Sequence, residues 1–429
     1  MKDWPVRTLG DLCREGGGFI RTGPFGSQLH RSDYTNDPSG IPVVMPKDMS
    51  AGRIDTTSVA RIDNETASRL SQHLLAQNDV VLSRRGDVGR SAWVFAKDLP
   101  AFCGTGSIRV HPGTPVSVRA EYLRYFFRSR LASDYLEGHA VGATMPNLNS
   151  GIVEALPVPV LPADLQDAAV VILHAIDDLI DNSRRRVEML EEMVRAIYQE
   201  WFVHFRYPGH ETVPLVDSHL GPIPESWLVR PVSAVLEVNP RLKATKGMPH
   251  PFITMADLNE RGMSCFPSAL RASTSGSKFE NGDTLLARIT PCLENGKTGY
   301  VQTLGEGDVG LGSTEFIVLR GREVGPAFTY CLARSDEMRN HAIASMSGAS
   351  GRQRVRNECF NSLHVASPSR QVSEAFEAIA LPMFSQIVTL GREGFRLTQM
   401  RDLLLPKLVT GQIDVSALDL DGLLEGAVA

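Results

Sequence analysis

The chain has 429 residues, a length that predicts about three domains. Hydrophobic residues make up 42% of the chain and charged residues 22%, which is typical of a globular protein and excludes a disordered, collagen-like or fibrous one. The formal net charge of −5 excludes a protein that is basic over its whole surface. The charge is unevenly spread, because residues 1–150 carry +3 and residues 211–370 carry +1, whereas residues 151–210 carry −5 and residues 371–429 carry −4.

The sequence carries none of the usual signals for export or membrane insertion. Its N-terminal residues form no apolar segment of the signal-peptide type, and no run of 18 apolar residues occurs along the chain. We therefore expect a cytoplasmic protein. The six cysteines form no CxxC pair, which argues against a zinc ribbon or a disulfide scaffold and favours reduced thiols.

Residues 1–160 predict a mixed α/β globule. Short runs rich in β-branched residues, such as residues 41–45 and 79–83, predict strands. Residues 121–136 predict an amphipathic helix, because aromatic and aliphatic side chains recur on one side.

Residues 161–207 predict one long helix. Neither glycine nor proline occurs between Asp164 and Phe205, and Asp164 is a suitable N-cap. Apolar residues recur at spacings near three and four, a heptad-like pattern that predicts packing against another helix. The predicted seam positions are Ile172, Ile176, Leu179, Val187, Leu190, Val194, Ile197 and Trp201.

The second half of the chain has the same kinds of sequence pattern in the same order as the first half. Residues 211–369 predict another mixed α/β globule, residues 370–411 a second long helix, and residues 412–429 an acidic tail. Gly394 in the seam and Pro406 in the last turn lower the helix propensity locally. The seam positions of this helix are Ile379, Met383, Ile387, Leu390, Leu397, Leu404 and Leu408.

These two halves are an internal repeat. A shift of 207 residues aligns Leu190 with Leu397 on the helices, and residues 78–84 resemble residues 282–288 in the globules. Neither long helix buries its seam alone, so we expect the two to pack together. The sequence thus predicts an α+β protein with two similar mixed α/β globular domains, separated by two long antiparallel helices that form a coiled-coil spacer with pseudo-two-fold symmetry.

The sequence offers little for catalysis. It contains no DPPY-like or NPPY-like tetrad of an amino-methyltransferase, no complete P-loop and no HExxH or HxH pair of histidines. The acidic pair at residues 191–192 has arginines nearby on the same helix, so we interpret it as a solvated face.

Three loops carry side chains suited to nucleic acid. Residues 23–28 form a glycine-rich turn followed by Ser27 and Gln28, and residues 84–90 carry three arginines in a loop between strands. Residues 352–356 alternate arginine with other residues, so three guanidinium groups share a face if this segment is extended. The equivalent segment of the first half, residues 145–149, is uncharged. Each segment is also compatible with an ordinary solvated loop.

These motifs, taken in order, resemble the specificity (S) subunit of type I restriction-modification systems. The segments that carry the resemblance are WPVRTLGDL, TGPFGSQL, GIPVVMPKDMSAGRID, NDVVLSRRGDVGRSAWV, MPNLNSGIVEALPVPVLPADLQ, ENGDTLLARITPCLENGKTGYV and LLLPKLVTGQID. Together they cover nearly the whole chain.

The resemblance implies a fold and a function. Each globule would be a target recognition domain for one half of a bipartite, asymmetric site in double-stranded DNA, and the helices would set the spacing. Two methyltransferase (M) subunits would dock on the helices and restriction (R) subunits would join them, in a system of phage defence. S-adenosylmethionine and ATP would bind to those partners, so this chain would be non-catalytic and hold no cofactor or metal.

From residue type and loop position we select candidate side chains for each role. The candidates for DNA contact are Ser27, Gln28, Lys47, Arg84, Arg85, Arg90, Arg288, Lys297, Arg352, Arg354 and Arg356. The candidates for the spacer and for partner docking are Ile176, Leu179, Leu190, Ile197, Trp201, Ile387, Leu390, Leu397, Leu404 and Leu408.

Two other functions remain open from the sequence. One is a coiled-coil scaffold whose globules bind protein, which the low net charge also fits. The other is a single-chain methyltransferase with its own recognition domains, against which the missing tetrad argues.

Overall fold

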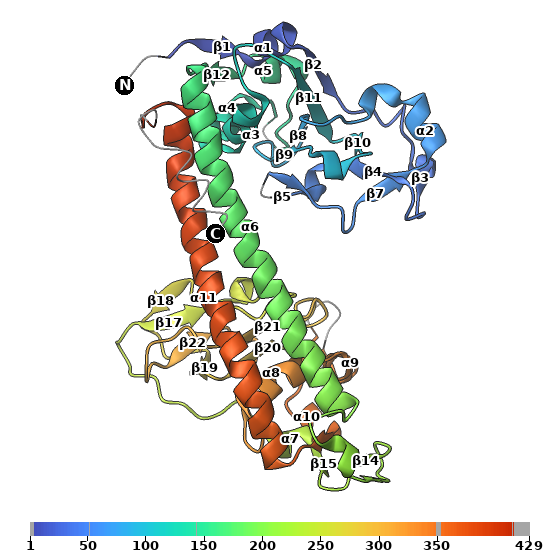
Figure 1. Ribbon diagram of the computed structural model, residues 1–429, viewed down its shortest axis with the longest axis vertical. Helices are drawn as coiled ribbons and strands as arrows, with labels where there is room; N and C mark the ends of the chain where they lie inside the picture. The colour runs from blue at the N-terminus through green and yellow to red at the C-terminus, as the bar shows by residue number, and fades with distance from the viewer. Residues whose placement is uncertain (1–3, 51, 143, 349–352, 414, 416–429) are drawn as a thin grey trace. The chain divides into compact units, whose positions relative to one another are not determined.

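The computed structural model describes residues 4–50, 52–142, 144–348, 353–413 and 415 (Figure 1). The chain divides into two compact units. Unit 1 contains Met1–Leu179 and Arg396–Ala429, and unit 2 contains Ile180–Phe395. Each unit therefore combines a globular part with a portion of two long helices, α6 (Ala163–Tyr198) and α11 (Arg370–Val409).

The globular part of unit 1 is built on two four-stranded sheets. The first sheet is antiparallel, with the order β2 (Gly17–Thr22), β11 (Ser107–Gly113), β8 (Val80–Ser83) and β9 (Ser91–Trp93). The second has the order β10 (Phe102–Cys103), β4 (Ile41–Val44), β7 (Ala60–Ile62) and β3 (Tyr34–Thr35), and its β10–β4 pair is parallel. Two ribbons complete the strands of this unit, namely β1 (Val6–Thr8) with β12 (Pro157–Pro159) and β5 (Met49–Ser50) with β6 (Arg53–Ile54).

Helices complete the cores of unit 1. They are α1 (Leu9–Glu15), α2 (Asn64–Arg69), α3 (Ala120–Arg128), α4 (Arg130–His139) and α5 (Ser150–Glu154). Helix α2 packs on the second sheet, and the others join the cluster of the first sheet. The aromatic side chains that predicted the helix at 121–136 lie in the core, although the segment forms two helices, α3 and α4. Leu173 of α6 and Leu408 of α11 join the same hydrophobic cluster, so both long helices contribute to this core.

Unit 2 repeats this arrangement. Its antiparallel sheet has the order β16 (Leu236–Val238), β23 (Phe316–Gly321), β20 (Thr284–Ala287) and β21 (Thr298–Tyr300). Its second sheet has the order β18 (Ala269–Arg271), β17 (His250–Ile253), β22 (Gly310–Gly312) and β19 (Ser277–Phe279), again with a parallel pair, β17–β22. The remaining elements are β13 (Leu215–Val216), β14 (Ile223–Pro224), β15 (Leu228–Pro231), β24 (His364–Ser367), α7 (Val232–Val235), α8 (Pro326–Arg334), α9 (Asp336–Ala344) and α10 (Cys359–Ser362).

One buried ion pair explains the sequence echo between residues 78–84 and 282–288. In unit 1, Asp79 is fully buried and its carboxylate accepts from Arg109 Nε at 2.6 Å. In unit 2, Asp283 accepts from Arg320 Nε at 2.7 Å. Each aspartate follows a residue with positive φ, which is Asn78 in one unit and a glycine in the other. The echo therefore records one turn and one buried ion pair, which hold the start of β8 and of β20 to the neighbouring strand.

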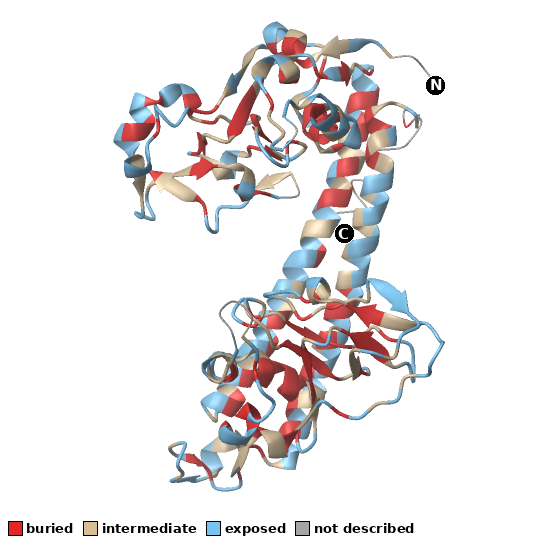
Figure 2. Cartoon of the chain, turned by 180° about the vertical axis from the view of Figure 1, so that it is seen from behind, coloured by how far each residue is buried: buried red, intermediate tan, exposed pale blue. Residues whose placement is uncertain are grey.

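The two long helices pack antiparallel within each unit. In unit 1, Leu165 and Leu173 of α6 join one cluster with Leu405 and Leu408 of α11. In unit 2, Tyr198 and residues beside it at the end of α6 pack on Phe376, near the start of α11. Figure 2 shows buried residues in the sheets and on the faces of these helices that contact them. Helix α11 begins 207 residues after α6, the same shift that aligns the two sequences.

The helix boundaries differ in detail from those predicted. Helix α6 begins at Ala163, so Asp164 lies in its first turn and is not the N-cap. It ends at Tyr198 and continues as a π-helical turn over Gln199–Val203, short of the predicted residue 207. Helix α11 runs through Gly394 and Pro406 without a break. A Cβ atom on Gly394 would lie 3.9 Å from Cβ of Ser183, so small residues allow the helices to approach closely there.

The predicted seam is less apolar than the spacing suggested. Ile176 is buried but Leu179 is 40% exposed. The other buried side chain at this level of α6 is Asp177, which is polar. The other seam residues of α6 that we predicted are half-buried or buried, and so are those of α11 apart from Ile379, which is 38% exposed. The predicted tail lies largely outside the described residues, and the domain boundaries that we drew at residues 160, 211 and 369 stay predictions.

A buried charge cluster joins α6 to α3 and α11 in unit 1. Asp177 of α6 accepts from Arg128 Nη1 at 2.5 Å, from the Tyr125 hydroxyl at 3.1 Å and from Arg401 Nη1 at 3.3 Å. A third arginine, Arg124, lies 3.4 Å away. Burial alone raises the pKa of Asp177, but the arginines outweigh it and the pKa lies below the ordinary value. The aspartate is therefore ionised and holds three elements together.

Unit 2 has a different buried carboxyl on α6, Glu191, for which our interpretation as part of a solvated face was wrong. Glu191 is 8% exposed and accepts from the backbone N–H of Met263 at 2.8 Å. Burial raises the pKa of Glu191 above its usual value, despite that hydrogen bond. The ionised form is thus less favourable here than in the unfolded chain.

We predict that Asp177→Asn destabilises unit 1 by about 3–5 kcal/mol, because it leaves buried guanidinium groups without their counter-charge. Thermal unfolding of the chain checks this. Asp167→Asn is the control on the same helix, since Asp167 pairs with Arg119 at an exposed site, and it should cost less than about 1 kcal/mol. The contribution of Asp177 should fade as the pH falls towards its lowered pKa. Equal effects of the two variants would contradict this account.

We predict that Glu191→Gln stabilises unit 2 above pH 6 and has little effect near pH 4. The glutamine oxygen can still accept the Met263 N–H, whereas the cost of a buried negative charge disappears. The pKa of Glu191 is higher in the folded chain than in the unfolded chain. The cost of the buried charge is therefore absent below the pKa of the unfolded chain, and it is present in full once the pH has risen through the pKa of the folded chain. Denaturant midpoints of both proteins at pH 4.5 and pH 8 measure the difference, and a gain that is equal at both values would refute it.

Candidate nucleic-acid interface

The arginine loop of unit 1 follows β8 and is held by a second segment. Arg85 forms a β-bridge with Asn147, and Leu148 N–H donates to the Arg84 carbonyl at 2.9 Å. The Arg85 side chain is exposed, whereas Arg84 is half-buried with its guanidinium 5.2 Å from the centre of the Phe25 ring. Burial, and then the neighbouring Arg85, lower the pKa of Arg84. Arg85 is therefore the side chain of this pair that a ligand can reach.

The glycine-rich turn lies against this loop. Ser27 and Gln28 are exposed, and the Gln28 side chain accepts from the Phe25 N–H at 3.1 Å. Since Phe25 also carries the Arg84 contact, the turn and the arginine loop form one surface.

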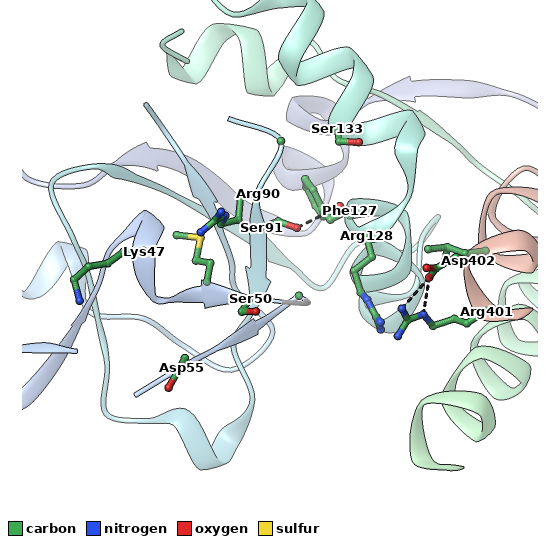
Figure 3. Close-up of a pocket in the computed structure, with 14 residues that line it drawn as sticks. Lys47, Ser50, Asp55, Arg90, Ser91, Phe127, Arg128, Ser133, Arg401 and Asp402 are labelled. Carbon is green, nitrogen blue, oxygen red and sulfur yellow. Dashed lines mark hydrogen bonds and ion pairs between the residues drawn. The ribbon is translucent and has the colours of Figure 1, made fainter. Parts of the chain in front are cut away.

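Lys47 and Arg90 line a shared pocket of about 630 Å³ in unit 1 (Figure 3). Lys47 donates to Asp48 at 2.6 Å, and Arg90 donates to Asp87 at 2.8 Å and to the Pro46 carbonyl at 3.2 Å. The other charged side chains that line the pocket are Asp55, Arg128, Arg401 and Asp402. Cations thus outnumber anions in this pocket, although Arg128 and Arg401 also serve Asp177.

In unit 2 the corresponding arginine, Arg288, follows β20. Its Nη2 donates to the Val355 carbonyl at 2.6 Å, and the Val355 N–H donates to the Arg288 carbonyl at 2.9 Å. Lys297 is half-buried and donates to the Met255 carbonyl at 3.0 Å. Both residues therefore have one structural contact already.

Arg354 and Arg356 are exposed on either side of the buried Val355, as the alternating pattern predicts. Arg354 makes a bidentate contact with Glu315, with Nη2–Oε1 at 2.7 Å and Nε–Oε2 at 2.9 Å. This hydrogen bonding lowers the pKa of Glu315. Arg352 lies outside the described residues.

The repeat places unlike side chains at equivalent positions. Asn147 bridges both Arg85 and Val141, and Arg354 bridges both Ile289 and Ser347. The same backbone arrangement therefore presents an uncharged amide in unit 1 and a guanidinium in unit 2.

Sequence reasoning missed three cations beside Arg288. Arg241, Lys243 and Lys278 line a pocket of about 570 Å³ together with Arg288. Arg241 and Lys243 follow Asn239–Pro240, which correspond to Gly23–Pro24 of unit 1. The Asn239 N–H donates to the Val318 carbonyl of β23, and the Gly23 N–H donates to the Ser107 carbonyl of β11. These two strands carry the arginines of the buried ion pairs. Aligning the two halves at this turn would have revealed them.

The long helices expose large apolar side chains. They are Leu179, Met189 and Met193 on α6 and Ile379, Leu381, Phe395, Met400 and Leu403 on α11. Exposed apolar side chains of this size are suited to protein contacts. In the portions of the chain that the structure describes, no helix is long and apolar enough to cross a membrane, and no group of three or more His, Cys, Asp or Glu side chains is arranged to hold a metal ion.

The chain thus contains two copies of one α+β architecture, with arginine-bearing loops at equivalent positions and two long helices in common. Comparisons with known proteins agree. A family model described as the type I restriction modification DNA specificity domain matches residues 1–192. The MjaIX type I restriction enzyme specificity subunit of Methanocaldococcus jannaschii is 24% identical over 439 aligned positions, which cover 97% of this chain and 95% of that protein.

Two further relatives extend the comparison. The EcoEI specificity subunit of Escherichia coli is 27% identical over 153 residues, which cover 34% of this chain and 26% of that protein. The crystal structure of the type I S subunit from M. genitalium superposes with a TM-score of 0.57 at 15% identity, covering 95% of this chain and 96% of the other, which supports the same fold. Over nearly its whole length the chain is thus similar to type I restriction-modification specificity subunits.

Proposed function

We propose that the globular parts, residues 1–160 and 211–369, each read one half of a bipartite, asymmetric DNA site. The observation that carries this proposal is the pair Asn147 and Arg354, an amide and a guanidinium at equivalent positions of one backbone arrangement. Asparagine pairs best with the edge of adenine and arginine with that of guanine. Unlike side chains at equivalent positions suit two unlike half-sites.

The ion pairs of the exposed arginines fit this role. Arg90 pairs with Asp87 and Arg354 with Glu315, so each guanidinium is held in place before a ligand arrives. A base edge or a phosphate can replace the carboxylate, and little side-chain entropy is lost in the exchange. Arg85 has no side-chain partner among the described residues and depends on its backbone bridge for its position.

The partners follow from the helices. We place two methyltransferase subunits against the exposed apolar side chains of α6 and α11, and restriction subunits on that assembly. S-adenosylmethionine and ATP belong to those subunits, and the complex acts on cytoplasmic DNA. The helices set the separation of the half-sites, because each helix is continuous from one compact unit into the other.

We predict that Arg85→Ala weakens recognition at one half-site by about 1–3 kcal/mol and leaves the other intact. The side chain is exposed, so its loss should not affect folding. Methylation by the complex of DNA duplexes with substitutions in either half measures the effect. Arg356→Ala is the matched control and should change the opposite half. An unchanged profile at both halves would remove Arg85 from the interface.

We predict that matched insertions lengthen the gap between the half-sites. Seven residues placed after Leu179 in α6 and seven after Phe395 in α11 keep both registers nearly unchanged, since seven residues make close to two turns. They add about 10 Å, equivalent to about three base pairs of DNA. Selection of preferred sites from random DNA should yield the same halves with a longer gap.

An insertion in α6 alone is the control for this experiment. It moves Ser183 and the seam after it out of register with α11, and it should abolish selection rather than shift the gap. A paired variant that selects the original gap would refute the spacer role.

A further inference from the structure

A basic pocket in unit 2 remains outside the candidate residues above. It lies between the segment after β16, the end of β20 and the edge strand β19, and its volume is about 570 Å³. Arg241 and Lys243 come from the first element, Arg288 from the second and Lys278 from the third. The lining contains no Asp or Glu. Four cations thus converge on one concave surface.

The nearest carboxylate does not neutralise this pocket. Glu315 lies beside Arg288 in the sheet, but its two oxygens are taken by Arg354. Among the residues that the structure describes, no carboxylate pairs with Arg241, Lys243 or Lys278. The Nε atom of Arg288 is buried and has no hydrogen-bond partner in the same residues. Arg84 Nε in unit 1 is buried and without a partner in the same way, so what distinguishes the pocket of unit 2 is its three further cations.

The segment that carries two of these cations is fixed in position. Asn239 has a φ of 54°, and it exchanges two hydrogen bonds with Val318, one through its backbone N–H and one through its side-chain oxygen. These bonds tie the segment to β23. Arg241 and Lys243 are therefore presented by an ordered turn.

The equivalent site of unit 1 keeps only one of the four cations, Arg84, which corresponds to Arg288. Phe25 stands where unit 2 has Arg241, and Ser27 stands in place of Lys243, because Gly23 and Asn239 are equivalent. Leu74 corresponds to Lys278. Leu74 pairs with β10, which runs parallel to β4, and Lys278 pairs with β22, which runs parallel to β17 in the same way. Phe25 also covers Arg84 there. The charges of Arg241, Lys243 and Lys278 are thus specific to unit 2 and are not needed for the fold that the two units share.

We propose that this pocket binds a backbone phosphate of duplex DNA, and that it contributes to the salt dependence of DNA binding. The inference rests on the DNA-binding function proposed above. Lysine side chains are point charges without the planar geometry that distinguishes bases, and an acid-free basic pocket selects for charge. The pocket therefore positions the duplex, whereas Arg354 and Arg356 read it.

The test is the salt dependence of DNA binding by the complex of this chain with its methyltransferase. In the variant R241A/K243A/K278A the slope of log K against log salt should become less negative by about 1, the contribution of one neutralised phosphate. Preference at both half-sites should stay as in the parent. The single variant Lys243→Ala, which changes one exposed side chain, should shift the slope in the same direction and guards against misfolding.

A charge-matched control separates the pocket from net charge. Arg230, Arg322 and Arg339 are cations of unit 2 outside the pocket lining, and the variant R230A/R322A/R339A should keep the parent slope. An unchanged slope in the pocket variant, an equal change in the control, or altered base preference would each overturn the inference. Failure of the parent complex to bind any DNA would instead refute the proposed function.

Discussion

Neither globular part completes its hydrophobic core without both long helices, and the rest of the structure depends on this constraint. In unit 1, Leu173 and Leu408 enter the same cluster as the aromatic residues of α3, and Asp177 fastens that contact with buried arginines. In unit 2, Trp201 and Phe376 belong to the same hydrophobic cluster as the buried residues of α8. Because each helix serves as core for its unit, the position of each recognition surface is tied to the helices and not to a flexible linker.

The shared architecture allows the two recognition surfaces to differ without cost to the fold. The buried pairs Asp79–Arg109 and Asp283–Arg320 fix the strand that precedes each arginine loop. The side chains beyond those strands are not part of the ion pairs that the two units share. Arg354 can therefore stand where unit 1 has Asn147, and Arg241 where unit 1 has Phe25. Unit 1 therefore has an arginine packed on an aromatic ring where unit 2 has a basic pocket.

The sequence predicts the two long helices and the repeat because both have a period that can be seen in the residues. It does not predict Asp177 as a seam residue, since its arginine partners on α3 lie about 50 positions away and only folding brings them near. Leu179 fits the heptad pattern but is 40% exposed, whereas Asp177, two residues before it, is buried. The basic pocket of unit 2 was missed because Arg241 and Lys278 are far apart in the chain, and neither forms a motif alone.

In the function proposed above, two unlike surfaces on a common pair of helices recognise two unlike DNA sequences at a fixed separation. Selection of bound sites from a random pool of duplex DNA by the parent complex tests this most directly. The predicted result is two different conserved blocks separated by a gap of constant length and no sequence preference. A single continuous block, or two blocks whose separation varies from site to site, would contradict it.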